Sequence, residues 1–229
     1  MRPTLTRLGI TTFNLDDWVA HTPKNILAKN FGVPESTFKD LPATNPYIFN
    51  ATIATKNVTG AVTPEAKGDA SFVYRTLQHP PEKIGGDGGT FYKIDSTNFP
   101  IAKRIAATFV TLKPGGLREL HWHPNAEEWL YFHQGQAKAS VFIGSGASRT
   151  FDFTAGDTAV FPTNSGHYIE NTSKDEDLVW IEIYKSERVA DISLSQWLAL
   201  TPPEIAAQTL KVPVDFIEKI KKEKQFLIQ

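Results

Sequence analysis

Between residues 71 and 185, short apolar runs alternate with turn-forming residues. The runs have the length of short strands and are rich in Val, Ile, Phe and Tyr. Strands are expected at 72–74, 91–94, 104–112, 119–123, 128–133, 137–143, 150–153, 157–161, 167–170 and 178–184. Glycine and proline clusters, such as those at 85–89 and 114–116, separate them. Roughly ten short strands predict an all-β core, folded as a sandwich or barrel of the jelly-roll kind.

Segments that are predicted to be helical flank this region on both sides, and the sequences of the two segments are similar to each other. Residues 13–41 predict two short helices separated at Gly32 and Pro34. At a constant offset, identical residues recur in the tail: Leu15, Trp18, Ala20, Thr22-Pro23, Ala28 and Val33-Pro34 match Leu194, Trp197, Ala199, Thr201-Pro202, Ala207 and Val212-Pro213. In the tail, Thr201 to Glu204 predicts a capping box at a helix start, and another helix is expected near Pro213. The chain therefore reads as the second half of a tandem duplication that kept the end of its first half.

These patterns predict three parts. Residues 1–70 are expected to form an N-terminal helical segment and a linker arm, because proline and glycine recur over 42–70. Residues 71–192 are expected to form the β-barrel. Residues 193–229 are expected to form C-terminal helices that pack on it. The fold class is therefore an all-β core with helical N- and C-terminal extensions.

Composition narrows the function classes. The chain has 229 residues, with 24 Lys+Arg against 25 Asp+Glu and a net charge of −1. We therefore expect a small-molecule ligand, with no nucleic acid and no membrane as partner. The chain has no cysteine, so any metal must be held by histidine and carboxylate. The N-terminal residues lack the apolar core of a signal peptide, and we expect a soluble chain, cytoplasmic or secreted after processing.

Candidate metal ligands concentrate in the stretch 115–135 and at one later residue, His167. His121 and His123 are separated by one residue, so on a strand both imidazoles point to the same face. After a short turn, either Glu127 or Glu128 returns on the next strand as an oxygen ligand. We favour Glu128, because it shares its parity with the apolar residues two and four positions later, which are expected to face inward.

The spacing of these residues resembles the two motifs of the cupin superfamily. The matching positions are Gly115, His121, His123, Glu128 and Gly135 in the first block, and Gly156, Pro162, His167 and Asn171 in the second. The resemblance implies a cupin β-barrel in which His121, His123, Glu128 and His167 bind a metal inside the barrel mouth. It also implies that residues 1–70 are the remnant of a preceding cupin. Four such ligands on a six-coordinate ion leave two adjacent positions open for substrate or dioxygen.

Around the motifs, the chain is similar to the C-terminal cupin of bicupin oxalate decarboxylases. The similarity lies in residues 118–126, 166–171 and 190–199, and residues 18–33 resemble the helices that end the N-terminal cupin of that family. The resemblance implies a manganese-dependent carboxy-lyase that converts oxalate to formate and carbon dioxide. Iron, zinc, nickel and copper are the alternative metals. The alternative functions are an oxalate oxidase that produces hydrogen peroxide, or a non-catalytic metal- and carboxylate-binding cupin whose partner half carries the chemistry.

The same resemblance assigns roles to three charged residues. Arg118 would hold the substrate carboxylate, and Glu182 would act as a proton-shuttling carboxyl group. Strict alternation sends Arg118 to the face opposite His121, so it reaches the pocket only across a bulge or from the barrel rim. Decarboxylation in this family depends on a mobile lid that supplies a glutamate. Glu187 occupies the lid position without the lid's usual sequence, and residues 6–12, at the matching position of the first copy, contain no glutamate.

Association is the remaining expectation. Bicupins pack their two barrels against each other, and this chain holds one barrel with no internal partner. We therefore expect a homo-oligomer, as a dimer, trimer or hexamer.

Overall fold

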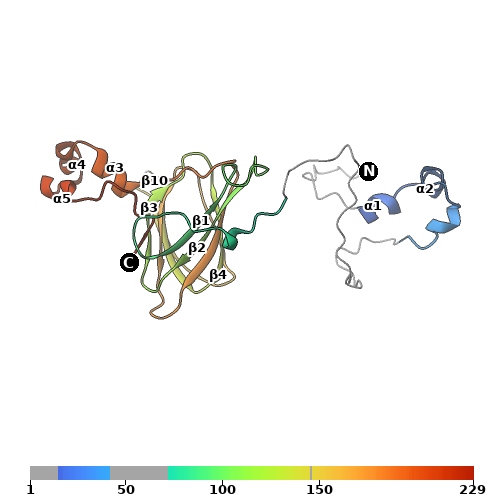
Figure 1. The fold of residues 1–229 in the computed structure, drawn as a ribbon, viewed down its shortest axis with the longest axis horizontal. Helices are drawn as coiled ribbons and strands as arrows, with labels where there is room; N and C mark the ends of the chain where they lie inside the picture. Colours follow the sequence, from blue (N-terminus) through green and yellow to red (C-terminus); the bar gives the residue numbers. More distant parts are fainter. Residues whose placement is uncertain (1–14, 42–71, 145) are drawn as a thin grey trace, which may run out of the picture. The chain divides into compact units, whose positions relative to one another are not determined.

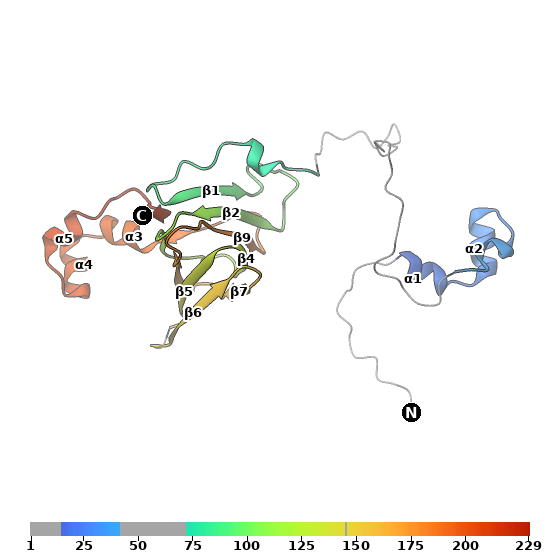
Figure 2. The ribbon, with the colours of Figure 1, turned by 90° about the horizontal axis from the view of Figure 1, so that it is seen from below.

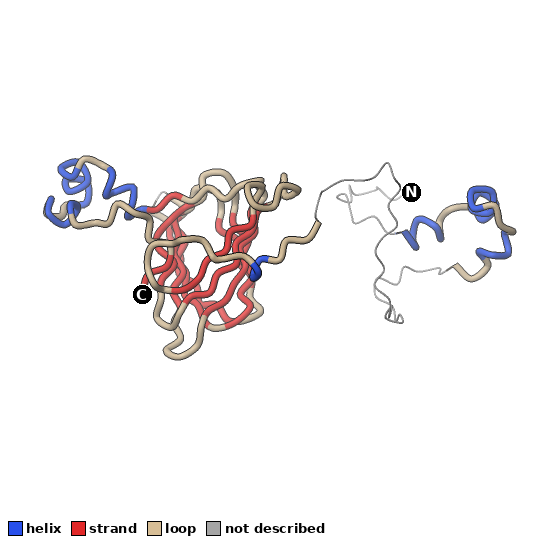
Figure 3. Tube along the Cα trace, viewed as in Figure 1, coloured by secondary structure: helices blue, strands red, loops and turns tan. Residues whose placement is uncertain are grey.

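The computed structural model describes residues 15–41, 72–144 and 146–229. The chain divides into two compact units, Met1–Lys67 and Gly68–Gln229. In the described part of the first unit the regular elements are short helices, whereas the second unit combines strands with C-terminal helices (Figures 1 and 3). The stretch 6–12, in which no lid glutamate was found, lies outside the described residues.

The second unit contains two antiparallel sheets (Figure 2). Its strands are β1 (Gly89–Ile94), β2 (Ala106–Leu112), β3 (Leu117–Trp122), β4 (Glu128–Gln134), β5 (Gln136–Phe142), β6 (Ser148–Thr154), β7 (Thr158–Phe161), β8 (Gly166–Asn171), β9 (Leu178–Tyr184), β10 (Ile192–Ser193) and β11 (Leu227–Ile228). One sheet has the order β1-β2-β9-β4-β7, and the other has the order β10-β3-β8-β5-β6, with β11 also paired to β3. In both sheets, strands that are distant in the sequence lie next to each other. This strand order confirms the expected jelly roll, built as two facing sheets.

Most of the predicted strands are present. Every strand expected from residue 91 onward is found, with shifts at its ends. The strand expected at 72–74 is wrong, because this stretch has a bend at Phe72 and then irregular backbone that leads into a short 3₁₀ helix, η3 (Thr76–Gln78). Phe72 and Val73 are 80% and 61% exposed, so most of the surface of these two side chains lies in solvent. The two-residue strands β10 and β11 were not predicted, because they exist only through pairing with β3.

The interior has an apolar end and a polar end. Along β4, Leu130 and Phe132 face inward at the apolar end, while Glu128 on the same face begins the polar end. On β9, Trp180 lies opposite Phe132, and Glu182 lies opposite Leu130. Alternation along the strands therefore places ionisable side chains in a continuous layer above the hydrophobic core.

The core tolerates little loss of volume. Leu130→Ala is expected to lower the free energy of unfolding by about 2–5 kcal/mol, because Leu130 is fully buried in the core cluster and its removal leaves a cavity. Tyr131, the next residue on β4, is 43% exposed and provides the matched control. For Tyr131→Ala we expect a loss of less than about 1 kcal/mol. Urea denaturation measures both, and equal losses would contradict the inward and outward assignment.

The C-terminal helices project from the β3–β10 edge of the second unit (Figures 1 and 2). They are α3 (Leu194–Leu200), α4 (Pro203–Leu210) and α5 (Val214–Glu218). Leu198, Ala206, Ala207 and Ile217 form their small core. Among the described residues, no helix is both long and apolar enough to cross a membrane.

The sequence repeat is also a repeat of backbone structure. The first unit contains α1 (Leu15–Ala20), α2 (Lys24–Phe31) and the 3₁₀ helix η1 (Glu35–Phe38), which match α3, α4 and α5 in order. Gly32 and Lys211 end α2 and α4 in the same left-handed conformation. Thr22 and Thr201 each donate a hydrogen bond of 2.8 Å to the carbonyl of the tryptophan four residues earlier.

This repeated threonine corrects two expectations. The capping box expected at Thr201 is wrong, because the Thr201 hydroxyl closes α3 and Pro202 is the N-cap of α4. In the first copy, the helix expected before Gly32 is divided at Thr22-Pro23 into α1 and α2. Proline disfavours a helical conformation in the residue before it, which explains both breaks.

Candidate metal centre

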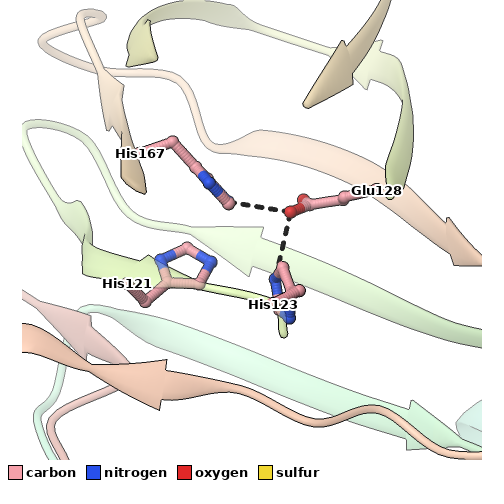
Figure 4. A group of neighbouring side chains, drawn as sticks. All are labelled: His121, His123, Glu128 and His167. Atoms are coloured by element: carbon pink, nitrogen blue, oxygen red, sulfur yellow. Dashed lines mark ion pairs between the residues drawn. The ribbon is translucent and has the colours of Figure 1, made fainter. Parts of the chain in front are cut away.

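Three strands bring four potential ligands together at the polar end of the jelly roll. His121 lies on β3, His123 directly follows it, Glu128 begins β4 and His167 lies on β8. Their ligand atoms all lie within 4.8 Å of one another, and all four side chains are buried (Figure 4). The pairing of β3 with β8 places His121 directly opposite His167. Glu127, the competing candidate, is exposed and lies outside this cluster.

Backbone carbonyls orient all three imidazoles. The Nδ1 atoms of His121, His123 and His167 lie 2.6, 2.7 and 2.8 Å from the carbonyl oxygens of Glu119, Ala190 and Ser165. A carbonyl can only accept, so each Nδ1 carries a proton, and in the neutral imidazole Nε2 then keeps the lone pair. The Nε2 atoms of His167 and His123 lie 2.8 and 3.1 Å from one Glu128 oxygen. These two Nε2 atoms therefore converge on the carboxylate.

The cluster fits a divalent cation. The Nε2 atoms of His121 and His167 and both oxygens of Glu128 are buried without a hydrogen-bond partner among the described residues. Unpaired polar atoms in an interior are costly, and a metal ion would satisfy all of them at once. Imidazole nitrogen combined with a single carboxylate suits first-row transition metals such as manganese, iron, zinc, nickel and copper.

Electrostatics favour the ligand forms of His121 and Glu128. Burial, followed by the charge of Arg118, lowers the pKa of His121 well below its usual value, so its imidazole is neutral. Burial alone would raise the pKa of Glu128, but His167 and His123 hold it well below its usual range. Burial opposes a charge on His123, yet its contact with Glu128 raises its pKa. Glu128 is therefore ionised at neutral pH, as a metal ligand must be.

Arg118 enters the interior through a β-bulge. The register of β3 against β8 shifts between Arg118 and His121, and Arg118 is fully buried. Strict alternation would point the Arg118 side chain to the face opposite His121, and the bulge allows it to point into the interior instead. The guanidinium forms an ion pair with Asp191. Burial opposes its charge, but the carboxylates of Asp191 and Glu182 outweigh this effect and raise the pKa of Arg118.

Glu182 lies on β9 in the same polar layer. Its carboxylate accepts hydrogen bonds from the Thr108 hydroxyl, from Trp180 Nε1 at 2.8 Å and from the Tyr184 hydroxyl at 2.6 Å. Burial, followed by the negative charge of Glu128, raises the pKa of Glu182. The Tyr184 oxygen also lies 3.5 Å from His123 Nε2. Glu182 is thus a carboxyl group that can hold a proton, connected to the metal cluster through Tyr184.

Glu187 does not join the site. It lies on the bend after β9, its side chain is exposed, and its carbonyl accepts a hydrogen bond from Ser96 N at 2.9 Å. Asn125 Nδ2 donates to the hydroxyl of Ser186 and to the carbonyl of Arg188, at 3.0 and 2.8 Å. These hydrogen bonds hold the bend against neighbouring loops, with the Glu187 side chain in solvent.

Several residues of the site were not found from the sequence. Tyr184 could have been, because it shares its parity on β9 with Glu182. Asp191 and Lys224 gave no signal, because nothing in the local pattern places them beside Arg118. Their roles depend on how β10 and β11 pair with β3.

Comparisons with known proteins agree with this geometry. The chain is 56% identical over 220 residues to the oxalate decarboxylase of Arthroderma benhamiae, covering 96% of this chain and 52% of the relative. It is 42% identical over 220 residues to oxalate decarboxylase OxdC of Bacillus subtilis, covering 96% of this chain and 56% of the relative. The chain thus spans about half the length of the curated relatives it matches.

The fold comparison gives the same result. A solved structure of the B. subtilis oxalate decarboxylase, determined in a study of its Mn(II) centres, matches with a TM-score of 0.88 and 41% identity, covering 96% of this chain and 58% of that chain. The Cupin family model matches residues 75–215, which include strands β1 to β10 and all four candidate ligands. The chain therefore belongs to the cupin family.

Proposed function

We propose that this chain is a manganese-dependent cupin that acts on oxalate as a carboxy-lyase, giving formate and carbon dioxide. The observation that carries the proposal is the buried cluster of three histidines and one glutamate, with a buried arginine in the same interior. The names of its relatives, oxalate decarboxylases at 56% and 42% identity, support the choice of substrate. The Mn(II) centres of the B. subtilis enzyme support the choice of metal.

The charges of the site suit a small dianion. A divalent ion together with the Glu128 carboxylate leaves one positive charge. Arg118 and Lys224 share the Asp191 carboxylate, which adds further positive charge. These cations favour an anionic ligand such as oxalate, because complementary charges favour binding in a buried site.

The residues divide the work as follows. A bound manganese ion would supply a positively charged centre for a carboxylate oxygen of oxalate. Arg118 would hold the other carboxylate through the donors that Asp191 leaves unused. Conversion of oxalate to formate replaces a carbon–carbon bond by a carbon–hydrogen bond, so a proton must reach the carbon that remains. Glu182, buried and with a raised pKa, would hold that proton on its carboxyl oxygen.

Glu182→Gln tests this assignment. We expect formate production to fall by about 100-fold or more, because the amide cannot exchange a proton, while bound metal stays unchanged. Glu170→Gln on β8 is the matched control, since Glu170 lies outside the layer of the metal ligands. Formate release by chromatography and metal content by elemental analysis are the measurements. If Glu182→Gln keeps full activity while Glu187→Gln loses it, the proton donor is Glu187.

The function itself is tested with purified, manganese-loaded chain and oxalate, with and without dioxygen. Formate as the product supports the proposal. Hydrogen peroxide in place of formate would assign the chain as an oxidase. Metal-loaded chain that binds oxalate and releases neither product would assign it as a carboxylate-binding cupin. The carboxylate-binding cupin is the second candidate function. The exposed position of Glu187 favours it, because no lid glutamate lies at the cluster in the described residues.

We also propose that the chain self-associates as a homo-oligomer. The C-terminal helices leave apolar side chains in solvent, with Trp197, Leu200, Ile205 and Phe216 between 50% and 65% exposed. Exposed apolar surface of this extent is typical of an interface. Light scattering coupled to size exclusion is expected to give a multiple of the 25.5 kDa chain mass. A strictly monomeric mass over the micromolar range would contradict the proposal.

A further inference from the structure

Beside Arg118 lies a second group of buried charges that takes no part in the metal cluster. Its members are Asp191, which precedes β10, and Lys224, which comes from the C-terminal tail. Their side chains are 6% and 12% exposed. Buried charges are retained where they pair closely, and Asp191 pairs with both Lys224 and Arg118.

Lys224 pairs with the carboxylate oxygen of Asp191 that Arg118 does not contact. Asp191 binds Arg118 Nη2 through Oδ2, and its Oδ1 lies 2.5 Å from Lys224 Nζ. Lys224 Nζ also donates to the Asp191 carbonyl at 2.9 Å and lies 4.2 Å from the centre of the Phe226 ring. The lysine therefore fixes both the side chain and the backbone of the residue that binds the guanidinium.

The tail is also joined to the strand that carries Arg118. β11 pairs with β3 so that Leu227 lies opposite Arg118, and the Phe226 carbonyl accepts a hydrogen bond from Glu119 N at 3.2 Å. The rings of Phe226 and Phe91 lie 5.4 and 5.5 Å from the guanidinium carbon. Two aromatic rings and one carboxylate thus restrict the guanidinium, an arrangement that suits its planar, delocalised charge.

This arrangement leaves specific donors unused. Arg118 Nε and Nη1 are buried and have no hydrogen-bond partner within the described ranges. A buried donor without a partner is unfavourable, and an entering carboxylate would satisfy it. Asp191 occupies Nη2, so the ligand is offered only the remaining donors.

We propose that the C-terminal tail, through Lys224 and Phe226, acts together with Asp191 to position Arg118 so that its Nε and Nη1 donors stay available for a carboxylate ligand. Asp191, Lys224 and Phe226 are positioning residues, since they act through Arg118. The inference rests on the proposed function, in which Arg118 is the carboxylate anchor.

Asp191→Asn separates positioning from simple attraction. The substitution keeps the volume of the side chain and removes one negative charge beside Arg118. If charge alone mattered, oxalate would bind more tightly. Positioning predicts the opposite, an affinity about tenfold weaker, which is the scale of one charged hydrogen bond. Calorimetric titration of the manganese-loaded chain with oxalate in the absence of dioxygen measures the affinity, and tighter or unchanged binding would overturn the inference.

Substitutions of Lys224 provide an independent test of the same proposal. Lys224→Met is expected to weaken oxalate binding about tenfold, and Lys224→Arg to restore it to within about twofold. Lys222→Met, an exposed lysine on the same tail, is the matched control and should bind oxalate as the unmodified chain does. Equal affinities of Lys224→Met and Lys222→Met would overturn the inference, even if Asp191→Asn failed to fold.

Arg118→Lys distinguishes a failure of the carboxylate anchor from a failure of the positioning residues. If the unmodified chain binds oxalate and Arg118→Lys binds it equally well, the anchor in the proposed function fails. If Arg118→Lys weakens binding while Asp191→Asn and Lys224→Met do not, only the positioning inference fails. Metal content and melting temperature of each variant show whether a change in affinity comes from a damaged site.

Discussion

His167→Ala is expected to lose its bound manganese and all turnover of oxalate. The substitution removes one of three nitrogen ligands and leaves the Glu128 carboxylate buried without its 2.8 Å contact. Residues that merely orient metal ligands contribute about 10- to 100-fold in affinity, so the loss of a ligand itself should exceed that range. Elemental analysis after dialysis against a weak chelator measures the metal per chain.

The matched control for this prediction is His133→Ala. His133 lies near the end of β4, is exposed and takes no part in the cluster. It should retain metal and activity at the level of the unmodified chain. If His167→Ala kept the metal stoichiometry of His133→Ala, the assignment of the site would be wrong.

Arg118→Ala is expected to lower the free energy of unfolding by about 3 kcal/mol. The substitution leaves the Asp191 carboxylate buried with Lys224 as its remaining partner, and breaking a buried ion pair from one side is strongly destabilising. Lys138→Ala is the matched control, because Lys138 pairs with Asp152 at 3.3 Å on the surface, where these side chains are 42% and 82% exposed. There the loss should stay below about 1 kcal/mol. Urea denaturation at neutral pH compares the two variants.

The same pair gives the stability a defined dependence on pH. Burial would raise the pKa of Asp191, but Arg118 and the neighbouring cations hold it well below its usual value. A depressed carboxyl pKa stabilises the fold above the unfolded pKa, about 3.9, and this contribution is lost as the pH falls through the folded pKa. In Arg118→Ala the folded pKa moves toward the unfolded one. The stability of this variant should therefore fall less steeply below about pH 4 than that of the unmodified chain. Parallel curves would contradict the role of this pair.

The alternation of side chains made much of the site predictable. It placed His121 and His123 on one face and selected Glu128 over Glu127, and the structure has these residues in the cluster and Glu127 in solvent. By the same rule, Arg118 can face the interior only if β3 contains a bulge, and the local sequence does not predict one. The bulge arises where β3 meets β8, so only the pairing of distant strands reveals it.

Pairing between distant segments also explains what the sequence could not predict. Lys224 and Phe226 follow a run of exposed lysines and look like part of a solvated tail. They become part of the interior because β11 adds to the edge of β3. Conversely, the apolar run at 72–74 looks like a strand and is not one, because it pairs with no strand among the described residues. Local pattern identifies a segment that can pair, and the partner decides whether it does.

The three carbonyls that accept hydrogen bonds from the imidazole Nδ1 atoms affect how this metal centre can evolve. Many metal centres fix their histidines with side-chain carboxylates, which a single substitution can remove. Here the proton on each ring is set by peptide groups, which every amino acid carries. Substitutions around the pocket can therefore alter what happens to the bound molecule while the ion stays in place. A centre of this kind can exchange one reaction for another without first losing its metal.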